Sequence, residues 1–197
     1  MANAIPSIAC LGVIGRNNNP LHITIFPSYD ATANTRAPLR TPLQYSLLLS
    51  STLDIFEARL RRGAPLVTGD YGLLHAVDER LAAYGFETNT GVKFVAVVDM
   101  RGRLAGGRPT SAGSGATGGG VGAGIRGGVG LRETELRVVF RAMQTAYVRL
   151  LQNPFYDPDE HAPLSPAGGG GKRITSRKFS EEMRRIGENW APGVASL

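Results

Sequence analysis

A glycine pattern in the second half of the chain is the first place to look for chemistry. Residues Gly122–Gly127 match the G-x-G-x-x-G turn that brings a helix N-terminus to a dinucleotide pyrophosphate. That use requires a strand directly before the turn, whereas residues 101–130 hold Gly, Ala, Ser, Thr and Arg with almost no large apolar side chain. Residues 166–173 fail as a phosphate loop because Pro166 and Arg173 replace the required Gly and Ser or Thr. The sequence therefore predicts no nucleotide cofactor.

The side chains that could bind metal or exchange protons are dispersed along the chain. Cys10 is the single cysteine and lies in an apolar segment, so we expect a small buried side chain. The histidines have no ligand spacing: His22, His75 and His161. His75 is expected to be a packed or hydrogen-bonded structural residue of a strand. A group of carboxylates lies in a polar loop, which favours a solvated role: Asp157, Asp159 and Glu160. We therefore expect no metal site, no cofactor and no enzymatic activity.

The charge pattern indicates a solvated basic surface. The 197-residue chain has a formal net charge of +6, and Arg supplies 19 of its 22 basic residues. These arginines are scattered, and Arg126–Gly128 is one Arg-Gly copy without aromatic neighbours, so no nucleic-acid partner is expected. Residues Met1–Ile14 lack the basic start of a signal peptide, and no run approaches the roughly 18 apolar residues that span a bilayer. We expect a cytoplasmic protein with only peripheral membrane contact.

Asp54 is one candidate for contact with a partner. It lies in a predicted helix that begins at Thr41-Pro42, a cap residue followed by Pro. The apolar stripe expected to face the core of that helix is Tyr45, Leu49, Leu53, Phe56 and Leu60. Asp54 lies at the boundary of this stripe. It is either an ordinary surface carboxylate, paired with Arg61 or Arg62, or part of an interface.

The segment Asn153-Pro154-Phe155-Tyr156 is the most distinctive short motif. One interpretation is an N-P-x-Y sorting signal, which requires an exposed tail. The segment instead directly follows an amphipathic helix expected at residues 131–152. We therefore favour a structural signature in which Pro154 stops the helix and both aromatic side chains turn back onto the core.

Five strands and three helices are predicted to position these residues. The strands are expected at Ile8–Ile14, Leu21–Phe26, Tyr71–Val77, Leu81–Thr88 and Val92–Val98. The first and fifth are apolar on both faces and should be central, which leaves the second and third as edges. The last helix should be capped by Thr175 or Ser176. The order β-β-α-β-β-β-α-α predicts an α+β fold, with a five-stranded antiparallel sheet, one helix on one face and two on the other.

Glycine marks two segments that should not contribute to the core. The chain has 26 Gly, and they are concentrated in residues 101–130 and 168–171. Such segments bury too little apolar surface to offset their ordering entropy. We expect one domain over residues 1–197, with disordered Gly-rich insertions at 101–130 and 158–173.

Several segments outside these insertions resemble a known family. They are Ile8–Ile14 followed by Asn-Pro-Leu-His-Ile, then Ser51–Ile55, Thr88–Asp99 and Gln152–Pro158. Together they are similar to the sedlin family, in particular its sedlin-like branch, whose members are subunits of the TRAPP (transport protein particle) complex. The predicted element order is that of the longin fold.

This resemblance implies a role in vesicle transport. TRAPP tethers vesicles and exchanges guanine nucleotide on Rab GTPases, between the endoplasmic reticulum and the Golgi and within the Golgi. The resemblance implies a non-catalytic adaptor that binds other TRAPP subunits, reaches a Rab GTPase only through the complex and is peripherally associated with those membranes. The helix-one aspartate linked to partner binding in the family matches Asp54. Another longin-type trafficking module, such as a small clathrin-adaptor chain, is the alternative.

Overall fold

The computed structural model describes residues 4–30, 34–61, 69–104, 131, 133–156 and 173–197. In chain order the strands and helices are β1 (Ala4–Ile14), β2 (Pro20–Ile25), β3 (Ser28–Asp30), β4 (Thr35–Ala37), α1 (Pro42–Arg61), β5 (Asp70–Ala76), β6 (Leu81–Glu87), β7 (Lys93–Leu104), α2 (Glu133–Leu151) and α3 (Arg177–Asn189). The predicted α+β architecture is confirmed.

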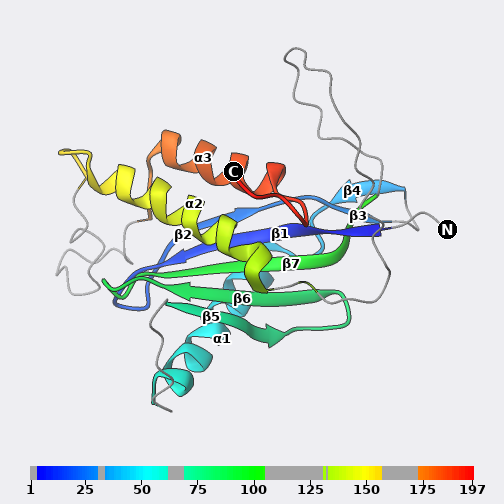
Figure 1. The fold of residues 1–197 in the computed structure, drawn as a ribbon, viewed down its shortest axis with the longest axis horizontal. Helices are drawn as coiled ribbons and strands as arrows, with labels where there is room; N and C mark the ends of the chain where they lie inside the picture. Colours follow the sequence, from blue (N-terminus) through cyan, green and yellow to red (C-terminus); the bar gives the residue numbers. More distant parts are fainter. Residues whose placement is uncertain (1–3, 31–33, 62–68, 105–130, 132, 157–172) are drawn as a thin grey trace.

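The main sheet has five strands in the order β2-β1-β7-β6-β5, and all four neighbouring pairs are antiparallel. The prediction of central first and fifth strands, with edges at the second and third, is confirmed by the positions of β1, β7, β2 and β5. Helices α2 and α3 cover one face of the sheet, and α1 crosses the opposite face (Figure 1).

The central strands divide their side chains between two cores. In β7, Phe94, Ala96 and Val98 face the core beneath α2 and α3. Val95 and Val97 face the core beneath α1. This alternation follows from the two-residue period of a strand, and it explains why both faces of β7 are apolar.

One predicted signal and two contacts that were not predicted fix the helices. The backbone N–H of Phe179 bonds the Ser176 side chain at 3.4 Å, which identifies Ser176 as the N-cap of α3. At the other end of α3, the indole of Trp190 donates to the Glu135 carbonyl of α2 at 3.2 Å and joins the two helices. On the opposite face, a Cβ at Gly12 would lie 2.7 Å from the Leu49 side chain, so this glycine permits α1 to pack closely on β1.

The apolar stripe predicted for α1 is partly wrong. Tyr45, Leu49 and Phe56 are buried, but Thr52 is also buried, and its hydroxyl bonds the Leu49 carbonyl at 2.6 Å. Leu53 is only partly buried, and Leu60 is 65% exposed. The stripe fails at Leu60 because this residue lies in the last turn of α1, where no described element packs over it.

Two further differences concern the strands. β7 continues to Leu104 because its last residues pair with the start of β1, so residues 101–104 do not belong to an insertion. A small two-stranded sheet of β3 and β4 lies within the polar segment 28–41, where no strand was predicted. The remaining residues of the two Gly-rich segments, 105–130 and 158–172, lie outside the described part of the chain.

Candidate interaction surfaces

Helix α1 begins in a reciprocal cap. The Thr41 backbone N–H bonds the Gln44 side chain at 2.9 Å, and the Gln44 N–H bonds the Thr41 hydroxyl at 3.3 Å. This capping box satisfies two N–H groups that lack helical partners. The predicted helix start at Thr41-Pro42 is therefore confirmed, and it fixes which side chains point away from the sheet.

The outer face of α1 carries exposed apolar side chains beside Asp54. Leu43 and Leu47 are 69% and 62% exposed, and Asp54 is exposed as well. Spacings of four and seven residues place these three side chains on one helix face, opposite Tyr45, Leu49 and Phe56. We call Leu43, Leu47 and Asp54 the α1 outer face. Arg61, one predicted partner of Asp54, instead pairs with Glu57 at 3.5 Å, whereas Arg62 lies outside the described residues.

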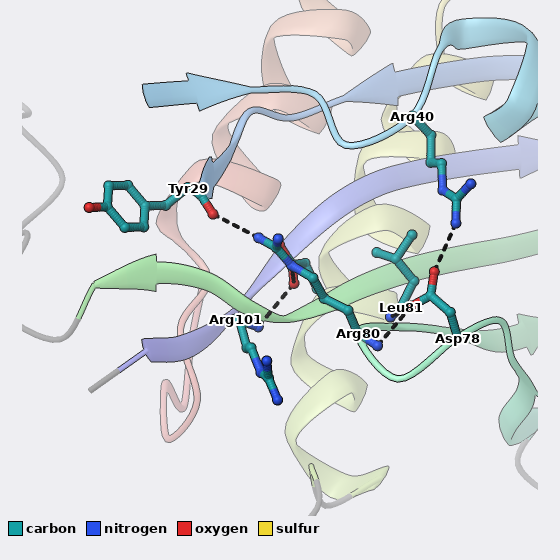
Figure 2. A network of polar contacts seen from close by, with 7 residues as sticks. Tyr29, Arg40, Asp78, Arg80, Leu81 and Arg101 are labelled. Atoms are coloured by element: carbon teal, nitrogen blue, oxygen red, sulfur yellow. Dashed lines mark hydrogen bonds and ion pairs between the residues drawn. The ribbon is translucent and has the colours of Figure 1, made fainter. Parts of the chain in front are cut away.

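A buried carboxylate organises the end of the sheet from which the chain enters α1. Asp99 of β7 is 0% exposed and accepts Arg80 Nε at 2.8 Å and Nη2 at 2.9 Å. Its Oδ1 also accepts the Arg101 backbone N–H at 2.9 Å. The same Arg80 Nη2 donates to the Tyr29 carbonyl at 2.7 Å, so one guanidinium in the β5–β6 turn joins β3 to β7 (Figure 2).

A second ion pair holds the residues directly before α1. Arg40 Nη2 lies 2.9 Å from Asp78 Oδ2 in the turn between β5 and β6 (Figure 2). Asp78 Oδ1 accepts the backbone N–H groups of Arg80 and Leu81, each at 2.7 Å. Burial acts to raise the pKa of Asp78, but these three groups stabilise the carboxylate, and the net effect lowers that pKa. The start of α1 is thus tied to the sheet by charged hydrogen bonds.

The other end of α1 covers an edge of the sheet. Arg59 donates through Nη1 to the Tyr71 carbonyl and through Nη2 to the Leu73 carbonyl of β5. These carbonyls belong to an edge strand, whose outward backbone groups can otherwise pair with another chain. Arg59 therefore occupies acceptors that an added strand would need at β5.

The Asn153–Tyr156 segment differs from its prediction at one residue. Pro154 follows the last helical turn, and Asn153 Oδ1 accepts the Phe155 backbone N–H at 3.2 Å. Tyr156 packs against the core, as expected, but Phe155 is 94% exposed. The Asx turn at Asn153 orients the two consecutive aromatic side chains differently, so only one of them turns back onto the core.

The predicted site residues form two separate regions. Asp54 lies on α1, and the Asn153–Tyr156 segment follows α2 on the opposite face of the sheet (Figure 1). Sequence reasoning missed Leu43 and Leu47, although their places off the stripe of Tyr45 and Leu49 could have identified them. Nothing in the sequence indicates that Arg59 reaches β5, because that contact depends on how α1 crosses the sheet.

Among the described residues, those considered for chemistry lie in different strands of the main sheet. Cys10 is buried in β1, and burial raises the pKa of its thiol to about 12. His75 was expected to be packed or hydrogen-bonded; it lies in β5 but is exposed, so the packed alternative is wrong. Edge strand β5 has a solvent-facing side there. Asp157, Asp159, Glu160, His161 and both glycine patterns lie outside the described residues.

One groove among the described residues has a charged lining. It measures about 500 Å³ and lies between α2 and α3, lined by residues that include Leu150 and Phe179. Arg149 and Glu182 pair across it at 3.0 Å. Among the described residues, no three His, Cys, Asp or Glu side chains lie close enough to hold a metal ion. None of the helices, over those same residues, has the length and apolarity needed to cross a bilayer.

Comparison with known proteins identifies related chains. The family model described as Sedlin matches residues 13–189. A Trafficking protein particle complex subunit 2-like protein from Dictyostelium discoideum is 25% identical over 180 residues, which cover 91% of this chain and 95% of the relative. The Mus musculus protein of that name is 26% identical over 174 residues, covering 86% and 89%. The Xenopus tropicalis protein is 24% identical over 155 residues, covering 77% and 84%.

Proposed function

Because this chain belongs to the sedlin family, we propose that it is a non-catalytic adaptor subunit of the TRAPP complex. In this role it binds other TRAPP subunits and helps assemble a machine that tethers vesicles and exchanges nucleotide on a Rab GTPase. It works between the endoplasmic reticulum and the Golgi and within the Golgi. The observation that supports this proposal is the match of related subunit sequences along most of the chain.

The α1 outer face is the surface that this adaptor uses to contact a TRAPP subunit. Leu43 and Leu47 are large apolar side chains that water surrounds in the isolated chain, and covering them would remove apolar area from solvent. Asp54 adds one negative charge two turns farther along the same face. The matching partner surface combines an apolar depression with an Arg or Lys that faces Asp54.

The chain reaches membranes and Rab through the complex. Its positive charge is scattered, which favours weak attraction to acidic surfaces over a dedicated lipid or nucleic-acid site. We therefore assign a cytoplasmic protein that is peripherally associated with Golgi and endoplasmic reticulum membranes.

Affinity purification of the tagged chain from its own cells tests the proposal. Other TRAPP subunits should be recovered with it in fixed proportion. An eluate without them would contradict an adaptor role in TRAPP.

Substitution of Asp54 tests the assigned surface. Asp54→Tyr places a bulky neutral ring on the α1 outer face and should reduce recovery of TRAPP subunits while the melting temperature stays near that of the wild type. Lys178→Tyr is the matched control, because Lys178 is an exposed residue of α3 on the opposite face of the sheet. Equal effects of the two substitutions on recovery would remove α1 from the interface.

A further inference from the structure

The outer edge of the main sheet at β2 has backbone groups that alternate in direction. The Phe26 N–H bonds the Ala9 carbonyl of β1 at 2.9 Å, and this fixes the phase of the alternation. Backbone direction in an antiparallel strand repeats every two residues, so Thr24 and His22 also direct their backbone groups toward β1. Ile23 and Ile25 therefore direct their N–H and C=O groups away from the sheet.

Both ends of this open stretch are closed. On one side the Leu21 carbonyl, which also points outward, accepts the Ile174 N–H at 2.8 Å. On the other side the next outward residue is Pro27, which has no N–H to donate. Within the described part of the chain, no backbone hydrogen bond reaches the outward groups of Ile23 and Ile25 from another segment. Among the described residues, the open edge is thus four backbone groups long.

The backbone groups of the two sheet edges, β5 and β2, have different partners. At β5 the Arg59 guanidinium occupies the carbonyls of Tyr71 and Leu73. At β2, the described part of the chain pairs through Ile174 and then continues into α3. This bond shows that an extended segment can lie beside β2, and no other described segment pairs with the neighbouring positions.

The side chains along β2 define what such a segment must look like. Ile23 and Ile25 are partly buried against the core beneath α1, so they present apolar surface on that face. On the other face, His22 Nε2 and Thr24 Oγ1 are hydrogen-bonded to each other at 2.8 Å. A segment lying beside β2 would meet apolar side chains on the α1 face and polar ones on the α3 face.

We propose that the edge at Ile23–Ile25 binds a short extended segment of another TRAPP subunit as an added antiparallel strand. The segment has apolar residues at alternate positions facing α1 and polar residues between them. Four backbone hydrogen bonds give the affinity, and Ile23 and Ile25 select the side chains. This inference rests on the proposed function for the source of the segment, but its surface is distinct from the α1 outer face.

Hydrogen exchange in the purified complex tests the proposal directly. In the isolated chain the Ile23 and Ile25 amides should exchange quickly, whereas the Thr24 amide, bonded to β1, should exchange slowly. In the TRAPP complex the Ile23 and Ile25 amides should slow by about tenfold or more, because an open edge amide becomes hydrogen-bonded. Fast exchange in a complex that contains the chain would overturn this inference while leaving the proposed function intact.

Proline substitution supplies the variant test. Ile23→Pro removes one outward N–H, and an edge strand tolerates proline where its N–H faces solvent. It should weaken binding to the complex by about tenfold with little loss of folded protein. Ile23→Ala keeps the N–H and controls for the lost side chain, and it should bind more tightly than Ile23→Pro. Equal binding of the two variants contradicts strand addition.

Two further measurements complete the test. Thr24→Pro removes an inward N–H and should lower the melting temperature strongly, which would confirm the alternation. An Ile23→Pro variant whose melting temperature falls as far as that of Thr24→Pro would overturn the alternation. Sedimentation of the isolated chain asks whether a second copy occupies the edge. A dimer that Ile23→Pro dissociates would refute the assigned partner.

Discussion

The two faces of the main sheet are built by the same strands but are covered in different ways. The face beneath α2 and α3 packs a large continuous core that includes Phe94, Phe140 and Trp190. The face beneath α1 has a smaller core, and its single helix has leucines on both its inner and its outer side. An apolar residue thus has different consequences on the two faces, because α2 and α3 cover each other's flanks and nothing in the described part of the chain covers α1.

Helices α3 and α1 are also held on their faces of the sheet by different kinds of contact. Helix α3 is held by its buried stripe and by the Trp190 bond to α2. Helix α1 adds charged contacts near its two ends, through Arg40 and Arg59. Polar contacts fix the orientation of a helix more narrowly than apolar packing does, since hydrogen bonds are directional. This difference suggests that the α2/α3 face mainly stabilises the fold and the α1 face mainly positions a surface.

The largest expected effect lies on the α2/α3 face. Phe140→Ala should lower the free energy of unfolding by about 3–5 kcal/mol, because a buried ring is replaced by a cavity. Phe155→Ala is the matched control on an exposed side chain, with an expected change within about 0.5 kcal/mol. Urea unfolding of both variants measures the difference. Similar losses would mean that Phe155 is covered in solution.

The polar contacts on the α1 side should give the next largest change in stability when they are removed. Arg80→Met leaves the buried Asp99 carboxylate without its cation and should destabilise the chain by about 3 kcal/mol. Adding Asp99→Asn to that variant removes the unpaired charge and should recover part of the loss. Thermal unfolding of the single and double variants tests this. No recovery in the double variant would show that Asp99 is not held as a buried charge.

The α1 outer face should affect binding and not stability. Leu43→Ser combined with Leu47→Ser should change the free energy of unfolding by less than about 1 kcal/mol, since both side chains are exposed in the isolated chain. The affinity for a TRAPP subunit should fall by about 2 kcal/mol or more if these leucines are binding hot spots. Calorimetric titration and urea unfolding of the same variant separate the two quantities. A large loss of stability would place the leucines in the fold.

Acid should reduce the stability contributed by His22 and by Asp78, on the two sides of the sheet, over different pH ranges. Burial, followed by the charge of Arg173, lowers the pKa of His22, which packs edge-on against Phe179 on the α3 side. The unfolded chain then binds the proton more readily, so this stability is complete above about pH 6.5 and is lost as pH falls toward the folded pKa. The pKa of Asp78 is also lowered in the folded chain, and its contribution is lost only below about pH 4.

Variants of these two residues distinguish the windows. His22→Gln should flatten the pH dependence of the melting temperature just below about pH 6.5, and Asp78→Asn should flatten it below about pH 4. An unchanged profile just below about pH 6.5 in His22→Gln would show that His22 titrates alike in the folded and unfolded chains.

The sequence predicted the elements well because their signals are local. Two-residue alternation identified the strands, and the doubly apolar segments identified β1 and β7 as central. Cap residues identified the starts of α1 and α3. The candidate site was harder to predict. Asp54 was singled out by family resemblance, and its role stays a prediction, while Leu43, Leu47 and the open edge of β2 were not found.

By itself, the sequence determined which side of each strand or helix is apolar, since period and capping are properties of neighbouring residues. Only the tertiary structure decided which apolar residues are covered and which backbone groups are open. Leu60 and Phe155 are exposed because no described element packs over them, although both were predicted to face the core. Arg59 closes the β5 edge because α1 crosses the sheet toward it, while no other described segment covers the β2 edge between Ile174 and Pro27. These outcomes depend on the approach of segments distant in sequence, and no local pattern encodes that approach.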